Sequence, residues 1–143
     1  MKYYDTHRMV KGEDLNHHGT LFAGRMCEWM IESGFTTVAN EYKHASNLVC
    51  VKVQEINFNY PLNKGDIINL RSKICYTGSK SITVYCKVDT SLDNRVFVDG
   101  FMTFVCVDDN KRPMAHNIIV DVPTVQEELD IYNRAKMLKE SIK

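Results

Sequence analysis

A loop rich in small and polar residues leads into a long apolar stretch, and this junction could carry chemistry. The loop covers residues 14–24 and includes Asn16, Gly19, Ala23 and Gly24. Backbone N–H groups at the start of a helix have no partners inside that helix, so they attract negative charge. Small residues there would let a carbonyl approach the backbone, which would stabilise the oxyanion of an acyl transfer. The alternative interpretation is an ordinary glycine-rich loop that caps a helix.

Charged residues within the apolar stretch share one face of the predicted helix. Arg25, Glu28 and Glu32 recur at three- and four-residue spacings, which places them on one side of a helix. One interpretation is a solvated strip with an Arg25–Glu28 ion pair. The other is that Glu32 faces a ligand cleft, where a carboxylate could activate water as a general base or attack a thioester directly.

Other reactive side chains give weaker signals. His17 and His18 are adjacent in the loop, so we expect their rings to point in different directions, with His18 the candidate for substrate contact. The remaining histidines have no partner at metal-ligand spacing, and the five cysteines form no Cys-x-x-Cys pair, so we expect neither a metal site nor a disulfide framework. A Gly-x-Ser-x-Gly turn, a phosphate loop and a dinucleotide fingerprint are all absent from the sequence.

The elements that must position these residues follow from periodicity. Residues 21–41 predict one long helix whose residues are apolar nearly all round, so we expect it to be buried on most sides. A short strand precedes it at residues 3–10. Four strand patterns follow, at residues 48–58, 67–76, 82–89 and 96–107. A charged helix is expected last, at residues 125–142.

This order predicts an α+β domain in which a curved antiparallel sheet wraps around one long helix. We expect a single domain over residues 1–143, with residues 124–143 as a helical extension. An antiparallel sheet has two edges, and pairing with a second copy would remove one of them. A homodimer is therefore expected, packed further into a tetramer or hexamer.

Composition limits the possible partners. The 143 residues include 18 Lys plus Arg and 18 Asp plus Glu, so no net charge favours nucleic acid binding. No apolar run approaches the roughly 20 residues of a membrane-spanning helix, and the first residues do not resemble a signal peptide. We expect a cytoplasmic protein without membrane insertion.

Three motifs together resemble one family. The stretch Asp14-x-Asn16-x-x-Gly19-x-x-Phe22-x-Gly24, followed by an apolar helix with an acidic residue, resembles the hotdog-fold acyl-CoA thioesterases. Phe58-Asn59-Tyr60-Pro61 followed by Lys64-Gly65-Asp66 is similar to the family's F-x-x-P…G-D element, and Thr77-Gly78-Ser79-Lys80-Ser81 to its G-x-x-S turn. These elements cover nearly the whole chain, residues 8–115.

The resemblance implies a hotdog fold, active sites at a subunit interface and hydrolysis of the thioester of an acyl-CoA. It assigns catalysis to a helix carboxylate, here Glu32, and to the loop and helix start, here Asn16 and Gly24. Coenzyme A is expected along the strands and turns, and no separate cofactor is implied, because coenzyme A is part of the substrate. The implied substrate-binding residues are His18, Gly19, Gly78, Lys80 and Ser81.

One departure from the family pattern concerns the carboxylate. In familiar members the acidic residue lies seven residues after the second glycine of a Gly-Gly pair, whereas here Ala23 replaces the first glycine and Ile31 occupies the seventh position. Glu32 is one residue further, which is about 100° around a helix. The sequence does not indicate the acyl chain length, or whether coenzyme A or an acyl-carrier protein bears it.

Two other functions remain open on this pattern. A non-catalytic acyl-CoA sensor would account for the displaced carboxylate, although known sensors of this fold carry an added DNA-binding region for which this chain has no room. A dehydratase or hydratase acting on acyl thioesters would resemble a different pattern, with a proline-rich, histidine-containing loop before the helix. Residues 11–24 contain no proline, which counts against that alternative.

Overall fold

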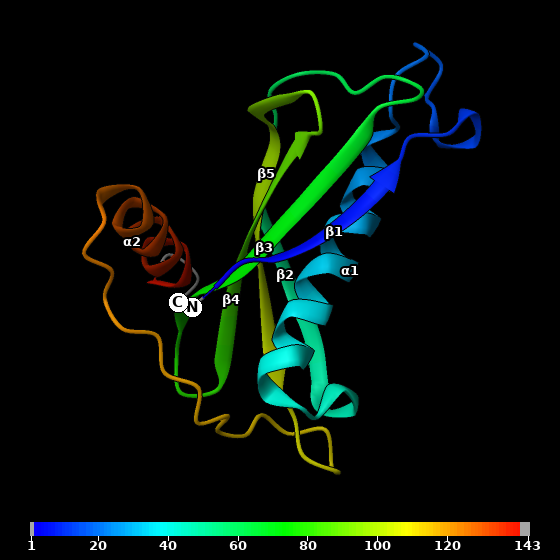
Figure 1. Ribbon diagram of the computed structural model, residues 1–143. Helices are drawn as coiled ribbons and strands as arrows, with labels where there is room; N and C mark the ends of the chain where they lie inside the picture. Colours follow the sequence, from blue (N-terminus) through cyan, green and yellow to red (C-terminus); the bar gives the residue numbers. More distant parts are fainter. Residues whose placement is uncertain (1, 141–143) are drawn as a thin grey trace.

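The computed structural model describes residues 2–140 of the chain. Figure 1 shows a short strand, a long helix, four further strands and a final helix, with two single turns of 3-10 helix at Gly12–Asp14 and Ala45–Asn47. The main elements are β1 (Tyr4–Met9), α1 (Ala23–Tyr42), β2 (Leu48–Phe58), β3 (Ile67–Thr77), β4 (Ser81–Thr90), β5 (Asp93–Cys106) and α2 (Gln126–Glu140). Every strand and helix expected from periodicity is present, with ends shifted by at most a few residues.

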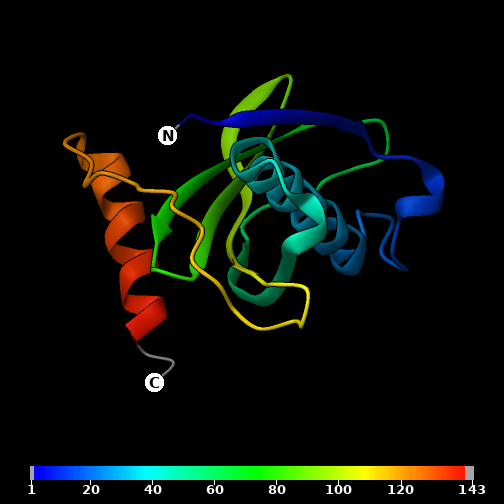
Figure 2. The same ribbon diagram turned by 90° about the horizontal axis from the view of Figure 1, so that it is seen from below.

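The strands form one antiparallel sheet in the order β1-β3-β4-β5-β2. The sheet curves around α1, which lies on its concave side, while α2 lies outside the sheet (Figure 2). This arrangement confirms the predicted α+β hotdog fold. The part of the predicted final helix beyond residue 140 lies outside the described residues.

The main core lies between α1 and the concave face of the sheet. Met26, Met30 and Val38 of α1 are fully buried against strand residues that include Ile68 and Leu70, and each such side chain contributes about 1.5–3 kcal/mol by leaving water. The helix approaches β5 closely at Gly34, where an added Cβ would lie 2.9 Å from Met102 Sδ.

The long helix is less enclosed than its composition predicted. Glu28, Glu32, Thr36 and Asn40 are exposed along one side, because within one chain the sheet covers only the opposite side of α1. The expectation of burial on most sides is therefore wrong for the single chain.

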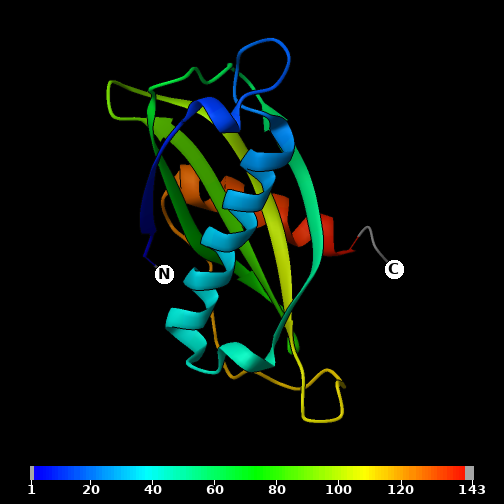
Figure 3. The same cartoon turned by 90° about the vertical axis from the view of Figure 1, so that its right-hand side faces the viewer.

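The convex face of the sheet is partly covered by α2, which lies behind the sheet when α1 faces the viewer (Figure 3). Ile131 and Ala135 of this helix are buried against Cys75, Tyr85 and Phe101. Lys73, itself buried, forms an ion pair with Glu128 at 3.2 Å. The final helix is thus packed onto the domain by a second, smaller apolar cluster.

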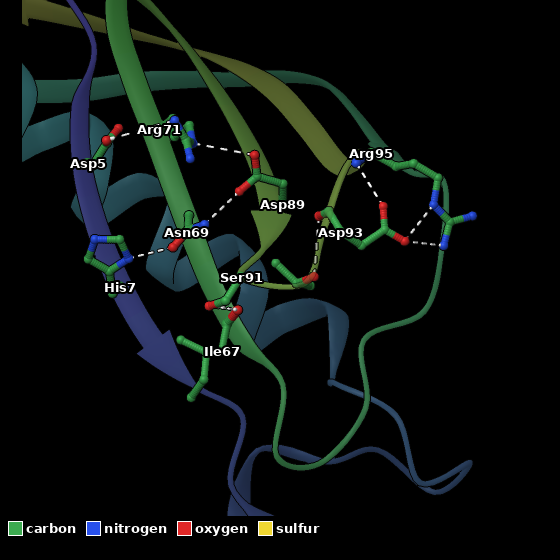
Figure 4. A network of polar contacts seen from close by, with 10 residues as sticks. Asp5, His7, Ile67, Asn69, Arg71, Asp89, Ser91, Asp93 and Arg95 are labelled. Carbon is green, nitrogen blue, oxygen red and sulfur yellow. Dashed lines mark hydrogen bonds and ion pairs between the residues drawn. The ribbon is translucent and has the colours of Figure 1, made fainter.

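A polar network ties β1, β3 and β4 together (Figure 4). His7 Nδ1 lies 2.5 Å from Asn69 Oδ1, and Asn69 Nδ2 donates to Asp89 Oδ1 at 2.9 Å. Arg71 Nε lies 3.4 Å from the other oxygen of Asp89. These contacts fix the edge strand β1, which has only one neighbour in the sheet.

The opposite edge, β2, exposes apolar side chains. Val49, Val51 and Val53 are all exposed, and the strand pairs only with β5, with register shifts between Cys50 and Lys52 and between Gln54 and Asn57. An edge strand with unpaired backbone groups and exposed apolar side chains is a surface suited to pairing with another strand.

Candidate active site

A buried carboxylate anchors the loop before α1. Asp14 accepts a hydrogen bond from the Lys11 backbone N–H at 2.9 Å and lies 3.5 Å from Arg25 Nε. Its carbonyl oxygen accepts from the Phe22 N–H at 2.9 Å. Asp14 therefore holds both ends of the loop, and the sequence offered it only as a motif residue.

The side chain of Asn16 closes the tip of the same loop. Its Oδ1 accepts from the N–H groups of His18 and Thr20 at 2.8 and 3.2 Å, and its Nδ2 donates to Thr20 Oγ1 at 3.0 Å. Gly19 between them has φ of 81°, a backbone conformation that favours glycine. Asn16 and Gly19 shape this loop, and His18 contributes its backbone to it.

The start of α1 leaves two backbone donors free. The Phe22 carbonyl accepts from the N–H groups of Arg25 and Met26 at 3.0 and 3.1 Å. Within residues 2–140, the N–H groups of Ala23 and Gly24 have no hydrogen-bond acceptor. Two adjacent free donors at a helix start can hold a developing oxyanion.

Ala23 lines a cleft of about 300 Å³ between the helix start and residues 58–62, and Gly24 is the next residue of the helix. Its lining is mainly apolar, with Asn16 and Thr20 on the loop side and Ala23 and Met26 on the helix side. A small acyl chain would lose contact with water there while its carbonyl met the free N–H groups.

Packing explains why residue 24 is a glycine. An added Cβ at Gly24 would lie only 2.6 Å from Cε2 of Phe22. The Phe22 ring, which is 54% exposed, therefore covers the Cα of Gly24.

Glu32 does not face this cleft. It forms an ion pair with Arg8 of β1, whose guanidinium also lies over the Trp29 ring at 5.0 Å. Glu32 and Glu28 line a second, charged cleft of about 490 Å³ between α1 and β1. Within one chain Glu32 therefore does not join Asn16 and Gly24, because one residue along a helix turns a side chain by about 100°, here toward β1; its catalytic role stays a prediction.

The neighbouring positions of α1 clarify this rotation. Ile31 is half-buried and packs against the main core, while Arg25 Nη1 and Glu28 Oε2 form the predicted pair at 4.0 Å on the exposed side. Cys27 is also half-buried, and burial raises the pKa of its thiol. This shift disfavours the thiolate, which is the nucleophilic form of cysteine.

The β3–β4 turn brings Gly78, Lys80 and Ser81 together. The Gly78 N–H donates to the Ser81 carbonyl at 2.9 Å. His116, which is buried, accepts at Nδ1 from the Ile118 N–H at 2.9 Å, so its Nε2 carries the proton and donates to the Gly78 carbonyl at 2.6 Å. Local sequence patterns contain no sign that His116 fixes this turn, because His116 lies 38 positions from Gly78 in the chain.

The loop and the turn lie at opposite ends of the sheet (Figure 1). We call them the loop end, next to residues 14–24, and the turn end, next to residues 78–81. The strand β3 runs between them over 11 residues, or about 35 Å at its usual rise. Within one chain the structure brings Asn16, Gly19 and Gly24 together, and separately Gly78, Lys80 and Ser81.

Comparison with known families agrees with this architecture. Residues 18–96 match the model of the thioesterase superfamily. The chain belongs to the thioesterase superfamily. The matched segment runs from residue 18 in the loop through α1 to the beginning of β5, so it contains Gly19, Gly24 and the β3–β4 turn but neither Asn16 nor α2.

Individual relatives of this thioesterase-superfamily chain are named for acyl-CoA hydrolysis. An uncharacterized acyl-CoA thioester hydrolase of Bacillus subtilis, YkhA, is 25% identical over 85% of this chain and 71% of its own length. A Staphylococcus aureus acyl-CoA hydrolase solved with butyryl coenzyme A is 25% identical, with a TM-score of 0.81 over 97% of this chain and 82% of that one. An apo-hexameric acyl-CoA thioesterase is 26% identical, with a TM-score of 0.82 over 97% and 89%.

None of the helices in residues 2–140 combines the length and the apolar character that crossing a membrane requires.

Proposed function

We propose that the protein hydrolyses acyl-CoA thioesters to the free acid and coenzyme A. The observation that carries this proposal is the free pair of N–H groups at Ala23 and Gly24, beside a mainly apolar cleft in a thioesterase-superfamily chain. The relatives named as acyl-CoA hydrolases support coenzyme A as the thiol part of the substrate.

The geometry suits one course of reaction. The acyl chain occupies the cleft, and the thioester carbonyl oxygen accepts hydrogen bonds from the Ala23 and Gly24 N–H groups. Water adds to the carbonyl carbon, and the N–H groups hold the resulting oxyanion. When the intermediate collapses, the carbon–sulfur bond breaks and the sulfur takes up the proton that the attacking water gave up, so that coenzyme A leaves as the thiol and the free acid remains.

Asn16 is placed to orient that water. Its Nδ2 carries two hydrogens, and one of them is donated to Thr20 Oγ1. The second is available in the cleft that Asn16 lines. We propose that Asn16 both closes the loop and directs the attacking water.

The carboxylate is the part of the site where this chain differs. Solved variants of the Staphylococcus aureus enzyme replace an asparagine and an aspartate by alanine. When the separation between those two residues is counted from Asn16 in this chain, the position reached is Ile31, which is not a carboxylate. No carboxylate lines the cleft within the described residues. This single observation favours a second candidate, a protein that binds acyl-CoA without hydrolysing it.

A second copy would complete the site. Two β2 strands pairing antiparallel about a two-fold axis would cover the exposed Val49, Val51 and Val53. That pairing reverses one chain relative to the other, so the turn end of the partner lies at the same side as the loop end of this chain. We therefore propose a dimer with shared sites, packed further into a tetramer or hexamer, and a cytoplasmic location, where cysteines stay reduced.

The test is a hydrolysis series over acyl-CoAs of increasing chain length. Loss of the thioester absorbance is the readout of choice, because the half-buried Cys27 and Cys50 would react in a thiol titration. Turnover that peaks at one chain length supports the proposal and defines the substrate. Calorimetric binding of acyl-CoA without turnover at any length would favour the binding protein, and absence of both would reject coenzyme A esters as ligands.

A further inference from the structure

The turn end collects hydrogen-bond donors from two distant parts of the chain. Because Gly78 has no side chain, two polar atoms approach its Cα: an added Cβ would lie 1.7 Å from Lys139 Nζ of α2 and 2.8 Å from Ser81 Oγ. Lys80 is exposed in the same turn. An ammonium group and a hydroxyl therefore meet beside Gly78, and a second lysine is exposed in the same turn.

These donors have no acceptors of their own. Neither Lys80 nor Lys139 forms an ion pair with any described residue, and Ser81 Oγ is buried without a hydrogen-bond partner in that part of the chain. The Gly78 carbonyl already accepts from His116. A group of unpaired donors with two positive charges is suited to an anion.

Packing of α2 holds Lys139 at this place. Tyr132 of the helix contacts Tyr76 of β3 with ring centroids 5.2 Å apart, and Lys139 Nζ lies 5.9 Å from the Tyr76 ring centroid. The buried Ile131 and Ala135 fix the helix on the sheet. The helix α2 lies outside residues 18–96 that match the superfamily, so Lys139 stands outside the segment on which the family assignment rests.

We propose that Lys139 binds a phosphate group of the coenzyme A moiety together with Lys80 and Ser81. The inference rests on the proposed function and deepens it, because it assigns the final helix to substrate binding. A lysine acts here as a point charge on the phosphate, with Ser81 and the turn as neutral donors.

The experiment compares Lys139→Met with Lys136→Met on butyryl-CoA, butyryl-dephospho-CoA and butyryl-pantetheine. Methionine keeps the apolar stem that packs on Tyr76 but removes the charge. Lys136 is a matched control, since it is exposed in the same last turns of α2 and has no ion pair within residues 2–140. Both changes alter the charge near the helix C-terminus equally.

We expect Lys139→Met to raise KM for butyryl-CoA about 5- to 10-fold with kcat unchanged, as for loss of one charge-assisted hydrogen bond. KM for butyryl-pantetheine, which has no phosphate, should not change, and Lys139→Arg should restore the wild-type KM for butyryl-CoA. If Lys139→Met leaves KM for butyryl-dephospho-CoA unchanged, the bound group is the 3′-phosphate that this substrate lacks.

An equal change on butyryl-CoA and butyryl-pantetheine, or no change on either, would overturn the role of Lys139. The proposed function is judged separately, by turnover of the wild-type protein. If the wild type is inactive, calorimetry with coenzyme A still tests the inference: a weaker Kd for Lys139→Met than for Lys136→Met supports it, and equal values reject it.

Discussion

The loop end and the turn end of the sheet both consist of small and polar residues, yet their free groups differ in kind. At the loop end the side chains of Asp14 and Asn16 are already bonded within the loop, and the free donors are backbone N–H groups at Ala23 and Gly24. At the turn end the backbone of Gly78 is bonded, and the free donors are side chains, including that of Lys139.

The difference indicates that the two ends have different roles in binding and reaction. Fixed backbone dipoles act where charge develops during the reaction, because they need no rearrangement when the oxyanion forms. Flexible ammonium groups suit a charge that is present before and after the reaction. Changes at the loop end should therefore alter kcat, and changes at the turn end should alter KM.

The largest expected effect comes from removing one loop-end donor. Ala23 is the first residue of α1, where proline is tolerated, and Phe22 before it has φ of −65° and ψ of 129°, which suits a residue preceding proline. Ala23→Pro should lower kcat about 10²–10³-fold, as for loss of an oxyanion donor, measured by steady-state hydrolysis.

The fold should tolerate this change. Thermal unfolding of Ala23→Pro should match the wild type or rise slightly, because proline restricts the unfolded chain. Ala23→Gly, which keeps the N–H group, is the control and should retain most of the turnover. An Ala23→Pro protein with wild-type kcat would show that the N–H groups at the helix start do not take part in the reaction.

The next effect tests whether the two ends meet across a dimer. Val51→Lys places a charge on the exposed edge of β2 and should produce monomers by light scattering. The ratio kcat/KM should then fall on the order of 10-fold or more through a higher KM, because each site loses the partner's turn end. Leu92→Lys, at a position 99% exposed in the β4–β5 turn, should change neither; a fully active Val51→Lys monomer would show that one chain suffices.

A smaller effect concerns the attachment of α2 at high pH. Burial raises the pKa of the Cys75 thiol to about 12, and burial, followed by the nearby Glu127 and Glu128, raises the pKa of Tyr3 to about 12. Both groups lie in or beside the cluster beneath α2. Their folded-state pKa values exceed those of the unfolded chain, so their stabilising contribution is complete below the unfolded values and is lost as pH rises toward 12.

Denaturant unfolding at a series of pH values from 8 to 11 measures this loss. Above the ordinary thiol pKa, Cys75 should lower the free energy of unfolding by up to about 1.4 kcal/mol per pH unit, and the partly exposed Tyr3 should add a smaller decrease above the ordinary tyrosine pKa. Cys75→Ala should give a shallower slope. An identical slope would show that this thiol does not control the alkaline instability.

The smallest effects are expected for the helix carboxylates. Glu32 pairs with Arg8 and Glu28 with Arg25 on an exposed surface, where such pairs contribute little. Glu32→Gln and Glu28→Gln should each retain kcat within about 3-fold, since loss of a general base instead costs roughly 10²–10⁴-fold. A loss of kcat of that size in Glu32→Gln but not in Glu28→Gln would show that the Glu32 carboxylate takes part in the reaction.

Much of the architecture could be predicted from local patterns. Alternation and β-branched residues located β2 at residues 48–58, as observed, and the periodicity of residues 21–41 located α1 within two residues at each end. The run of Asn16, Gly19 and Gly24 before an apolar helix indicated a loop that leads into a helix start. These signals are local, because backbone preferences and side-chain spacing act over only a few residues.

The sequence by itself thus determined the elements, their order and the loop that precedes α1. Only the tertiary structure decided which side of α1 faces which cleft, that Glu32 turns toward Arg8, and that the loop and turn ends lie apart. It also brought His116 and Lys139 to Gly78. The physical reason is that spacing sets directions around a helix axis, whereas the neighbours in those directions depend on strand pairing and packing between distant segments.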